Sequence, residues 1–276
     1  MSGWKRQAVG DLPMYQATAM AWLPGIVQGF TTRSGGVSAA PYDTLNFGAD
    51  VGDSAAAVQA NRERLWSDLG FAPAQVALAE QVHGNGVARV TQGGPTPAAG
   101  ADALITDTPN VLLMLLYADC VPVYLADPVG RSLGLMHVGW RGATAGIVAK
   151  TVAAMRAAFG MLPGHCMVAI GPSIAADNYE VGRDVADQFR NFPGGSSSGA
   201  STAVLPRDEM SGKYTLNLRQ IVFTQLLAAG LKAEYISVCD EDTYRNRRDF
   251  FSHRRDGAAT GRMAAFLSLR SSTEAV

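Results

Sequence analysis

Short apolar runs between residues 76 and 138 place the strongest limit on what this chain can fold into. Glycine, proline and aspartate separate the runs, a pattern typical of strands joined by turns. The runs are 76–78, 87–90, 111–117, 121–125 and 133–138. The sequence therefore predicts a strand-rich core in this part of the chain.

Helices are predicted on both sides of this segment. One covers 54–69, where Asp53 can cap the N-terminus and Gly70 ends the helix. Further helices are expected over 144–159, 184–192 and 218–229, and further strands over 26–32, 167–170 and 235–238. With 47% apolar and 17% charged residues, the chain has enough material for a packed core. We expect an α+β (α/β-like) fold, a single domain of mixed β-sheets with flanking helices.

Charge and N-terminal composition exclude several classes of partner. The net charge is −1 and the pI about 6.4, so the basic excess that nucleic-acid binding needs is missing. No apolar run near the N-terminus indicates a secretion signal, and the stretch 111–118 is far shorter than the ~20 residues that span a bilayer. Three widely spaced cysteines indicate a reducing compartment. We expect a soluble, cytoplasmic protein that binds neither nucleic acid nor membranes.

Two histidines and one cysteine at the ends of predicted strands form the main candidate site. Among only four histidines, His83 follows an apolar run and His137 lies at the end of the run 133–138, while Cys120 separates two runs. Two imidazoles and one thiolate with an open fourth position suit a catalytic zinc ion. A blue-copper site adds a weak axial methionine, but Met136 precedes His137 on a strand and so points to the opposite face. A single histidine or buried cysteine is more often structural than functional, so the case depends on all three together.

Ten motifs in a fixed order make the chain resemble a known family. They are FTTRSGGVS (30–38), LNFG (45–48), NR (61–62), QVHG (81–84), DALIT (102–106), ADCVP (118–122), HVGWRG (137–142), IGPSI (170–174), YEVG (179–182) and FSHRRDG (251–257). Together they resemble the laccase-domain family, variously labelled multicopper polyphenol oxidase-like, peptidoglycan-editing factor and purine nucleoside phosphorylase. On this resemblance, 26–270 is a laccase-like metalloenzyme domain, 1–25 an N-terminal extension and 271–276 a C-terminal tail. The Gly/Ser stretch 194–199 is interpreted as a surface loop.

The resemblance also implies roles for single residues. His83, Cys120 and His137 match the metal ligands and are also candidate catalytic residues, together with Asp119 and Arg33. Asp119 is interpreted as a general base, as a residue that orients a ligand, or as a plain turn residue. The candidate substrate- or phosphate-binding residues are Arg33, Asn46, His253, Arg254 and Arg255. His253 stands where the family tends to have Tyr and adds a second candidate acid or base, while Asp240 stands where Thr is usual.

The leading hypothesis is a zinc-dependent purine nucleoside phosphorylase acting on adenosine, inosine and methylthioadenosine, with associated adenosine deaminase activity. The partners are then small molecules, a purine nucleoside and phosphate, and the protein a monomer or small homo-oligomer. One alternative is a peptidoglycan-precursor editing hydrolase, and another is a metal-stabilised binding protein. Copper is the other candidate metal, but four histidines cannot ligate the trinuclear cluster and mononuclear site of a copper-dependent polyphenol oxidase.

Overall fold

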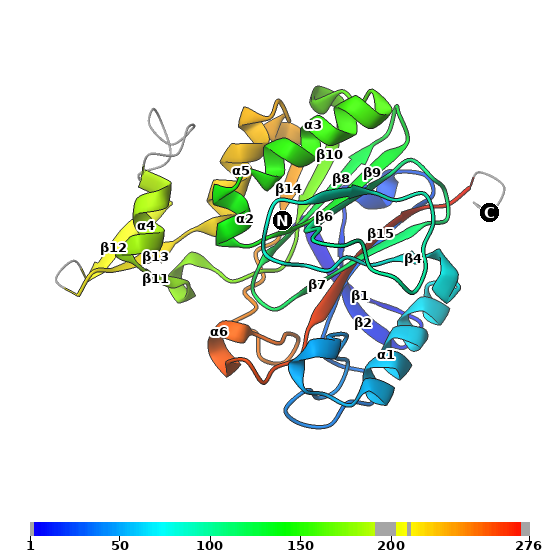
Figure 1. Cartoon of the computed structure of the whole chain (residues 1–276), viewed down its shortest axis with the longest axis horizontal. Coiled ribbons are helices and arrows are strands. Elements are labelled where there is room, and N and C mark those ends of the chain that lie inside the picture. The colour runs from blue at the N-terminus through cyan, green and yellow to red at the C-terminus, as the bar shows by residue number, and fades with distance from the viewer. Residues whose placement is uncertain (1–2, 191–202, 209–210, 272–276) are drawn as a thin grey trace.

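Two six-stranded sheets form the centre of the computed structural model, which describes residues 3–190, 203–208 and 211–271 (Figure 1). The first sheet has the order β1 (Trp4–Val9), β2 (Leu12–Ala17), β3 (Ile26–Thr31), β15 (Met263–Leu269), β7 (Leu112–Tyr117) and β4 (Val76–Ala77). The second has the order β14 (Ile236–Val238), β10 (Met167–Ile170), β8 (Val121–Asp127), β9 (Ser132–Val138), β6 (Ala103–Thr106) and β5 (Val87–Arg89). The predicted runs between 76 and 138 thus become strands in both sheets.

The two sheets pack face to face, and alternation along each strand divides the core. On β7, Leu113 and Leu115 point into the layer between the sheets, whereas Leu112 and Met114 point to the outer face. The inner layer joins residues of both sheets, including Tyr117 of β7 and Leu133 and Leu135 of β9. Both faces of the central strands are therefore buried, which explains their continuous apolar runs.

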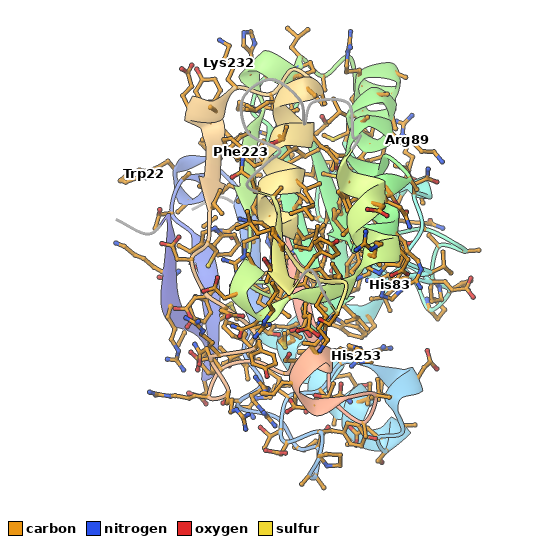
Figure 2. All side chains as sticks on the ribbon, turned by 90° about the vertical axis from the view of Figure 1, so that its left-hand side faces the viewer. Trp22, His83, Arg89, Phe223, Lys232 and His253 are labelled. Atoms are coloured by element: carbon orange, nitrogen blue, oxygen red, sulfur yellow. The ribbon has the colours of Figure 1, made fainter. Side chains whose placement is uncertain are left out.

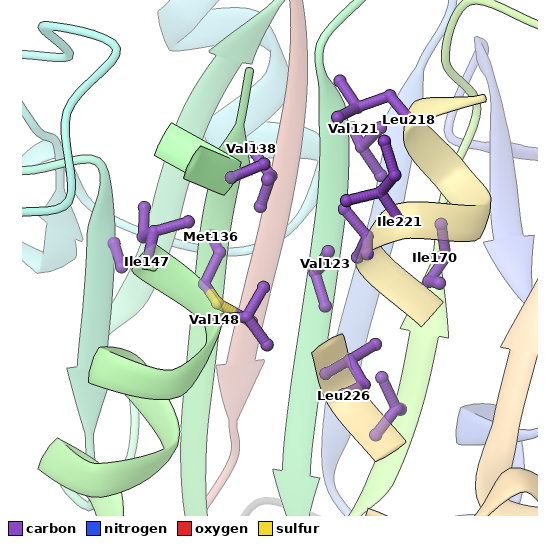
Figure 3. Packing of buried hydrophobic residues seen from close by; sticks show 14 of the residues in the cluster. Val121, Val123, Met136, Val138, Ile147, Val148, Ile170, Leu218, Ile221 and Leu226 are labelled. Atoms are coloured by element: carbon purple, nitrogen blue, oxygen red, sulfur yellow. The ribbon is translucent and has the colours of Figure 1, made fainter. Parts of the chain in front are cut away.

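Helices cover the outer face of each sheet. Helix α1 (Ala55–Asp68) packs Leu65 and Trp66 against the first sheet. On the second sheet, α3 (Ile147–Phe159) and α5 (Leu218–Ala228) bury an aliphatic cluster with β8, β9 and β10 (Figure 3). Figure 3 also shows Met136 pointing toward Val148 of α3. None of the helices among the described residues is long and apolar enough to cross a membrane.

Two helix boundaries differ from the prediction. Ser54, not Asp53, caps α1, because its side chain accepts the amide N–H of Ala57. The helix predicted over 144–159 begins at Ile147, as α3, and an unpredicted short helix, α2 (Trp140–Thr144), precedes it. Gly146 separates the two because it adopts a left-handed conformation (φ 77°). Helix α2 therefore begins at the end of β9, directly beside His137.

A third sheet lies to one side of these layers, as Figure 1 shows. It has the order β11 (Glu180–Gly182), β13 (Lys213–Leu216) and β12 (Val204–Asp208), and α4 (Arg183–Arg190) follows β11. At the other end of the chain, β1 pairs with β2 and β2 pairs with β3, so the first sheet continues across the expected boundary at residue 26. The stretch 194–199 and residues 272–276 of the expected tail lie outside the described residues.

A buried carboxylate ties β1 and β2 to the loop that precedes helix α6 (His253–Asp256). The guanidinium of Arg6 donates to both oxygens of Asp249 at 3.0 and 3.1 Å, and the Tyr15 hydroxyl donates at 2.8 Å. Burial opposes ionisation of Asp249, but the hydrogen bonds from Arg6 and Tyr15 outweigh it and lower the pKa of this carboxyl below 3.8. The ionised form of Asp249 therefore stabilises the fold.

We expect Asp249→Asn to lower the free energy of unfolding by about 1–2 kcal/mol at neutral pH. Because the folded pKa is depressed, this contribution is complete above the ordinary value of 3.8 and disappears as the pH falls through the lower folded value. Urea unfolding of wild type and variant at neutral and acidic pH measures the difference. If the difference in free energy of unfolding between wild type and variant stays constant through this acidic range, ionised Asp249 does not stabilise the fold.

Candidate metal centre and pocket

The candidate metal ligands meet where the chain crosses from the first sheet to the second. Cys120 lies between β7 and β8, and the preceding Asp119 adopts a positive φ of 94° that lets the backbone make this crossing. His137 is the penultimate residue of β9, and its ring packs edge-on against Tyr117 in the layer between the sheets. The ligand atoms of His83, Cys120 and His137 all lie within 4.8 Å of one another. The structure thus brings the three predicted ligands together.

Asp102, which was not among the predicted site residues, holds two of the ligands in place. Its buried carboxylate accepts the backbone N–H groups of Val82, His83 and Gly84 at 3.1, 3.0 and 2.7 Å. It also lies 2.8 Å from Nδ1 of His137. A proton on Nδ1 leaves Nε2 of His137 free to bind a metal, the usual carboxylate–histidine–metal arrangement. Asp102 opens one of the recognised motifs, but no spacing rule assigns it this role.

Gly139 provides the space in which the ligand side chains approach one another. A Cβ atom at this position would lie 3.2 Å from Sγ of Cys120 and 3.3 Å from Cδ2 of His83. A larger residue would therefore press on both ligands. The donor types, their mutual distances and this open space fit one metal ion bound by two imidazoles and a thiolate.

Cys120 and His137 shift each other's pKa. Burial raises the pKa of Cys120, but the charges and hydrogen bonds of His137 and His83 together outweigh burial and lower it to about 6. Burial lowers the pKa of His137, whereas Cys120 and Asp102 raise it to about 9. Cys120 is therefore a thiolate at neutral pH, which is the form that binds metal ions.

Asp119 connects the crossing segment to helix α6. One of its oxygens accepts the Thr243 hydroxyl at 2.7 Å, and the other accepts the Ser252 hydroxyl at 3.0 Å and the backbone N–H of Arg254 at 2.7 Å. With both oxygens engaged, Asp119 is placed to position Cys120 and α6. This geometry favours an orienting role over that of general base.

A pocket of about 700 Å³ includes all three metal ligands in its lining. Small-molecule sites typically measure ~300–1,000 Å³. Figure 2 shows His83 and His253 on the same face of the molecule. The basic side chains that also line the pocket are Arg62, Arg141, His253, Arg254 and Arg262. The pocket can therefore hold a polar or anionic ligand beside the metal centre.

Three residues predicted to bind substrate are engaged elsewhere. Arg33 pairs with Asp43 at 3.3 Å and lies over the ring of Phe251, outside the pocket lining. Asn46 is fully buried and hydrogen-bonds the backbone around Gly48. The guanidinium of Arg255 donates to three backbone carbonyls and to Asp256. Of the predicted binding residues, His253 and Arg254 are the ones that line the pocket.

The two neighbouring arginines of α6 should respond differently to substitution. We expect Arg255→Ala to reduce stability by about 2–3 kcal/mol, because the Thr243, Tyr244 and Phe250 carbonyls lose a charged donor. Arg254→Ala should lower the melting temperature much less, because its exposed side chain donates to one carbonyl, that of Glu180, and it should raise the KM for the nucleoside. Thermal unfolding and steady-state kinetics of both variants measure this. The interpretation is wrong if Arg255→Ala melts like wild type.

The fold and site define a mixed α/β protein in which strand ends of two packed sheets present a candidate mononuclear metal centre. The chain belongs to the family described as multi-copper polyphenol oxidoreductase laccase, which matches residues 27–270. This match confirms the resemblance drawn from the sequence motifs.

Relatives at similar levels of identity extend over nearly the whole chain. Purine nucleoside phosphorylase YlmD of Geobacillus stearothermophilus is 38% identical over 274 residues, 93% of this chain and 97% of that protein. Purine nucleoside phosphorylase YfiH of Escherichia coli strain K12 is 36% identical and covers 89% of this chain and 94% of its own. The crystal structure of YlmD from Geobacillus stearothermophilus matches with a TM-score of 0.90 at 36% identity, covering 98% of this chain and 100% of that chain. These likenesses confirm the predicted mixed fold.

Proposed function

We propose that the protein is a zinc-dependent purine nucleoside phosphorylase for adenosine, inosine and methylthioadenosine, with associated adenosine deaminase activity. The observation that carries the proposal is the shared pocket, which contains the His83, Cys120 and His137 cluster and several arginines. The names of the relatives support a purine nucleoside as substrate. A reducing compartment such as the cytoplasm is part of the proposal, because Cys120 has to stay unoxidised to bind a metal ion.

The donor set favours zinc over copper in this proposal. Two histidines and a cysteine with an open fourth position match a catalytic zinc site. A blue-copper site also needs a weak axial ligand, and Met136 packs into the aliphatic cluster under α3 instead. The whole chain has four histidines, too few for a multicopper oxidase. These facts support one zinc ion.

In the proposed phosphorolysis, a phosphate oxygen attacks C1′ of the ribose as the bond from C1′ to N9 of the purine breaks. The electron pair of that bond leaves with the purine, which takes up a proton. The exposed imidazole of His253 lines the pocket and is our candidate for the proton donor. Zinc held by the three ligands supplies a Lewis acid in the same pocket. Asp102 and Asp119 maintain the positions of the ligands during the reaction.

A panel of nucleosides tests the proposal. Zinc-loaded protein with inosine and phosphate should release hypoxanthine and ribose 1-phosphate, and adenosine should also yield inosine and ammonia. Chromatography of the products, with Cys120→Ala as the inactive control, measures both reactions. Turnover of a muramoyl-amino-acid precursor without any nucleoside turnover would contradict the proposal.

A further inference from the structure

Two arginines from distant parts of the sequence contribute to one wall of the pocket. Arg62 lies on α1, and Arg262 immediately precedes β15. The intervening part of this wall is the segment 48–51, which also lines the pocket. Neither arginine was predicted as a site residue, although Arg62 belongs to one of the recognised motifs. Their side chains are partly buried.

Each guanidinium keeps hydrogen-bond donors that have no acceptor among the residues the structure describes. Arg62 uses Nε and Nη2 to donate to the carbonyl of Phe47 at 3.2 and 2.9 Å, and Arg262 uses Nη1 to donate to the carbonyls of Thr260 and Gly261. Within residues 3–190, 203–208 and 211–271, neither arginine has a carboxylate within ion-pair distance. That leaves Nη1 of Arg62, and Nε and Nη2 of Arg262, available to a ligand. A partly buried guanidinium stays charged and gains most from an anionic partner.

The wall is built in a way that holds Arg262 in place. Oδ1 of Asn46 accepts the backbone N–H of Arg262 at 2.8 Å and that of Gly48 at 2.9 Å. A Cβ atom at Gly48 would lie 2.7 Å from Cγ of Arg262, so only glycine leaves room for this side chain. Asn61 donates to the carbonyl of Asn46 at 2.9 Å and so links the wall to α1. The predicted binding residue Asn46 therefore acts behind Arg262.

The wall and the metal centre line the same pocket, so one ligand can contact both. Burial lowers the pKa of Arg262, while the charges of Cys120 and Asp119 act in the opposite direction. Asp50 and Glu80 are acidic residues that also line the pocket, but both are exposed and neither is ion-paired with Arg62 or Arg262 among the described residues. Arg254, by comparison, already donates to the Glu180 carbonyl.

We propose that Arg62 and Arg262 together bind inorganic phosphate, the co-substrate of phosphorolysis. This inference rests on the proposed function, and it assigns the phosphate to the α1–β15 wall instead of Arg33, Arg254 or Arg255. The forked edge of Arg262 matches two phosphate oxygens, and Nη1 of Arg62 supplies a further donor. Phosphate held there faces a nucleoside placed beside the metal centre.

Titration calorimetry of the zinc-loaded protein with inorganic phosphate tests the site without any nucleoside. We expect Arg62→Gln and Arg262→Gln each to weaken phosphate binding by about 10- to 100-fold, because each loses a charge-assisted contact. Arg262→Lys keeps the charge but not the fork and should recover part of the loss. Arg64→Gln is the matched control, since Arg64 lies on the same helix outside the pocket lining. Melting curves confirm that each variant is folded.

Other outcomes separate this site from the proposed function. If the protein phosphorolyses inosine and both Gln variants keep the wild-type Kd and KM for phosphate, the site is wrong and the function stands. If both variants lose phosphate binding but wild type shows no phosphorolysis, the site stands and the function is wrong. A titration with AMP shows whether the site binds the phosphate group of a nucleotide instead of inorganic phosphate. Binding of AMP that depends on Arg62, with no measurable binding of inorganic phosphate, would overturn the assignment.

Discussion

Replacing Cys120 with alanine should remove the metal from the protein and abolish turnover. Cys120 supplies the thiolate of the three-ligand cluster, and alanine offers no donor in its place. Loss of an outer partner of a metal ligand already costs ~10–100-fold in affinity, and loss of a ligand itself should cost more. Competition with a chromophoric zinc chelator measures the affinity, and inosine phosphorolysis measures turnover.

A second cysteine provides the control for this experiment. Cys166 is buried in the aliphatic cluster beneath α3 and α5 and is not part of the metal cluster. Cys166→Ala should lower the melting temperature through the cavity it leaves, yet keep its zinc. Retention of stoichiometric zinc by Cys120→Ala would show that the ligand set is wrong.

Replacing Asp102 with asparagine should weaken zinc binding by about 10–100-fold although no ligand is removed. The amide nitrogen of asparagine donates hydrogen bonds and cannot accept them. Either His137 or part of the 82–84 backbone therefore loses its acceptor. We also expect stability to fall by about 1–3 kcal/mol, because buried donors are left unpaired. Chelator competition and urea unfolding measure the two effects.

Cobalt substitution separates a positioning role for Asp102 from a purely structural one. The visible absorption of bound Co²⁺ reports ligand geometry, so Asp102→Asn should change the spectrum as well as the affinity. Asp107→Asn is a suitable control. Asp102 and Asp107 lie at opposite ends of β6, but Asp107 pairs with Arg89 at the surface. A spectrum and zinc affinity equal to those of wild type would leave Asp102 without a role at the metal.

The central strands were predictable because both of their faces are buried. β7 and β8 therefore read as continuous apolar runs. By contrast, β1 was not predicted, because it is an edge strand whose sequence, WKRQAV, is mostly exposed. β15 was not predicted either, because its alanines and serine carry no strand signal. The edge position and the pairing of β15 between β3 and β7 appear only in three dimensions.

The clustering of His83, Cys120 and His137 could be predicted from residue type and strand-end position, but the residues that support the cluster could not. Asp102 reaches His137 from 35 positions away. Arg62 and Arg262 meet at one pocket only because α1 packs on the sheet that contains β15. The contacts of Arg255 with the Thr243, Tyr244 and Phe250 carbonyls are of the same kind. Whether an arginine next to the pocket binds a ligand or supports the protein backbone depends on which carbonyl groups surround it. No sequence pattern shows those contacts.

Reconstitution of the metal-free protein tests directly whether phosphorolysis depends on one bound zinc ion. Apoprotein is titrated with zinc while the release of ribose 1-phosphate from inosine and phosphate is followed. We expect activity to rise with added zinc and to reach its plateau at one zinc ion per chain. Activity that is independent of zinc, or activity restored by copper together with oxidation of phenols, would contradict it.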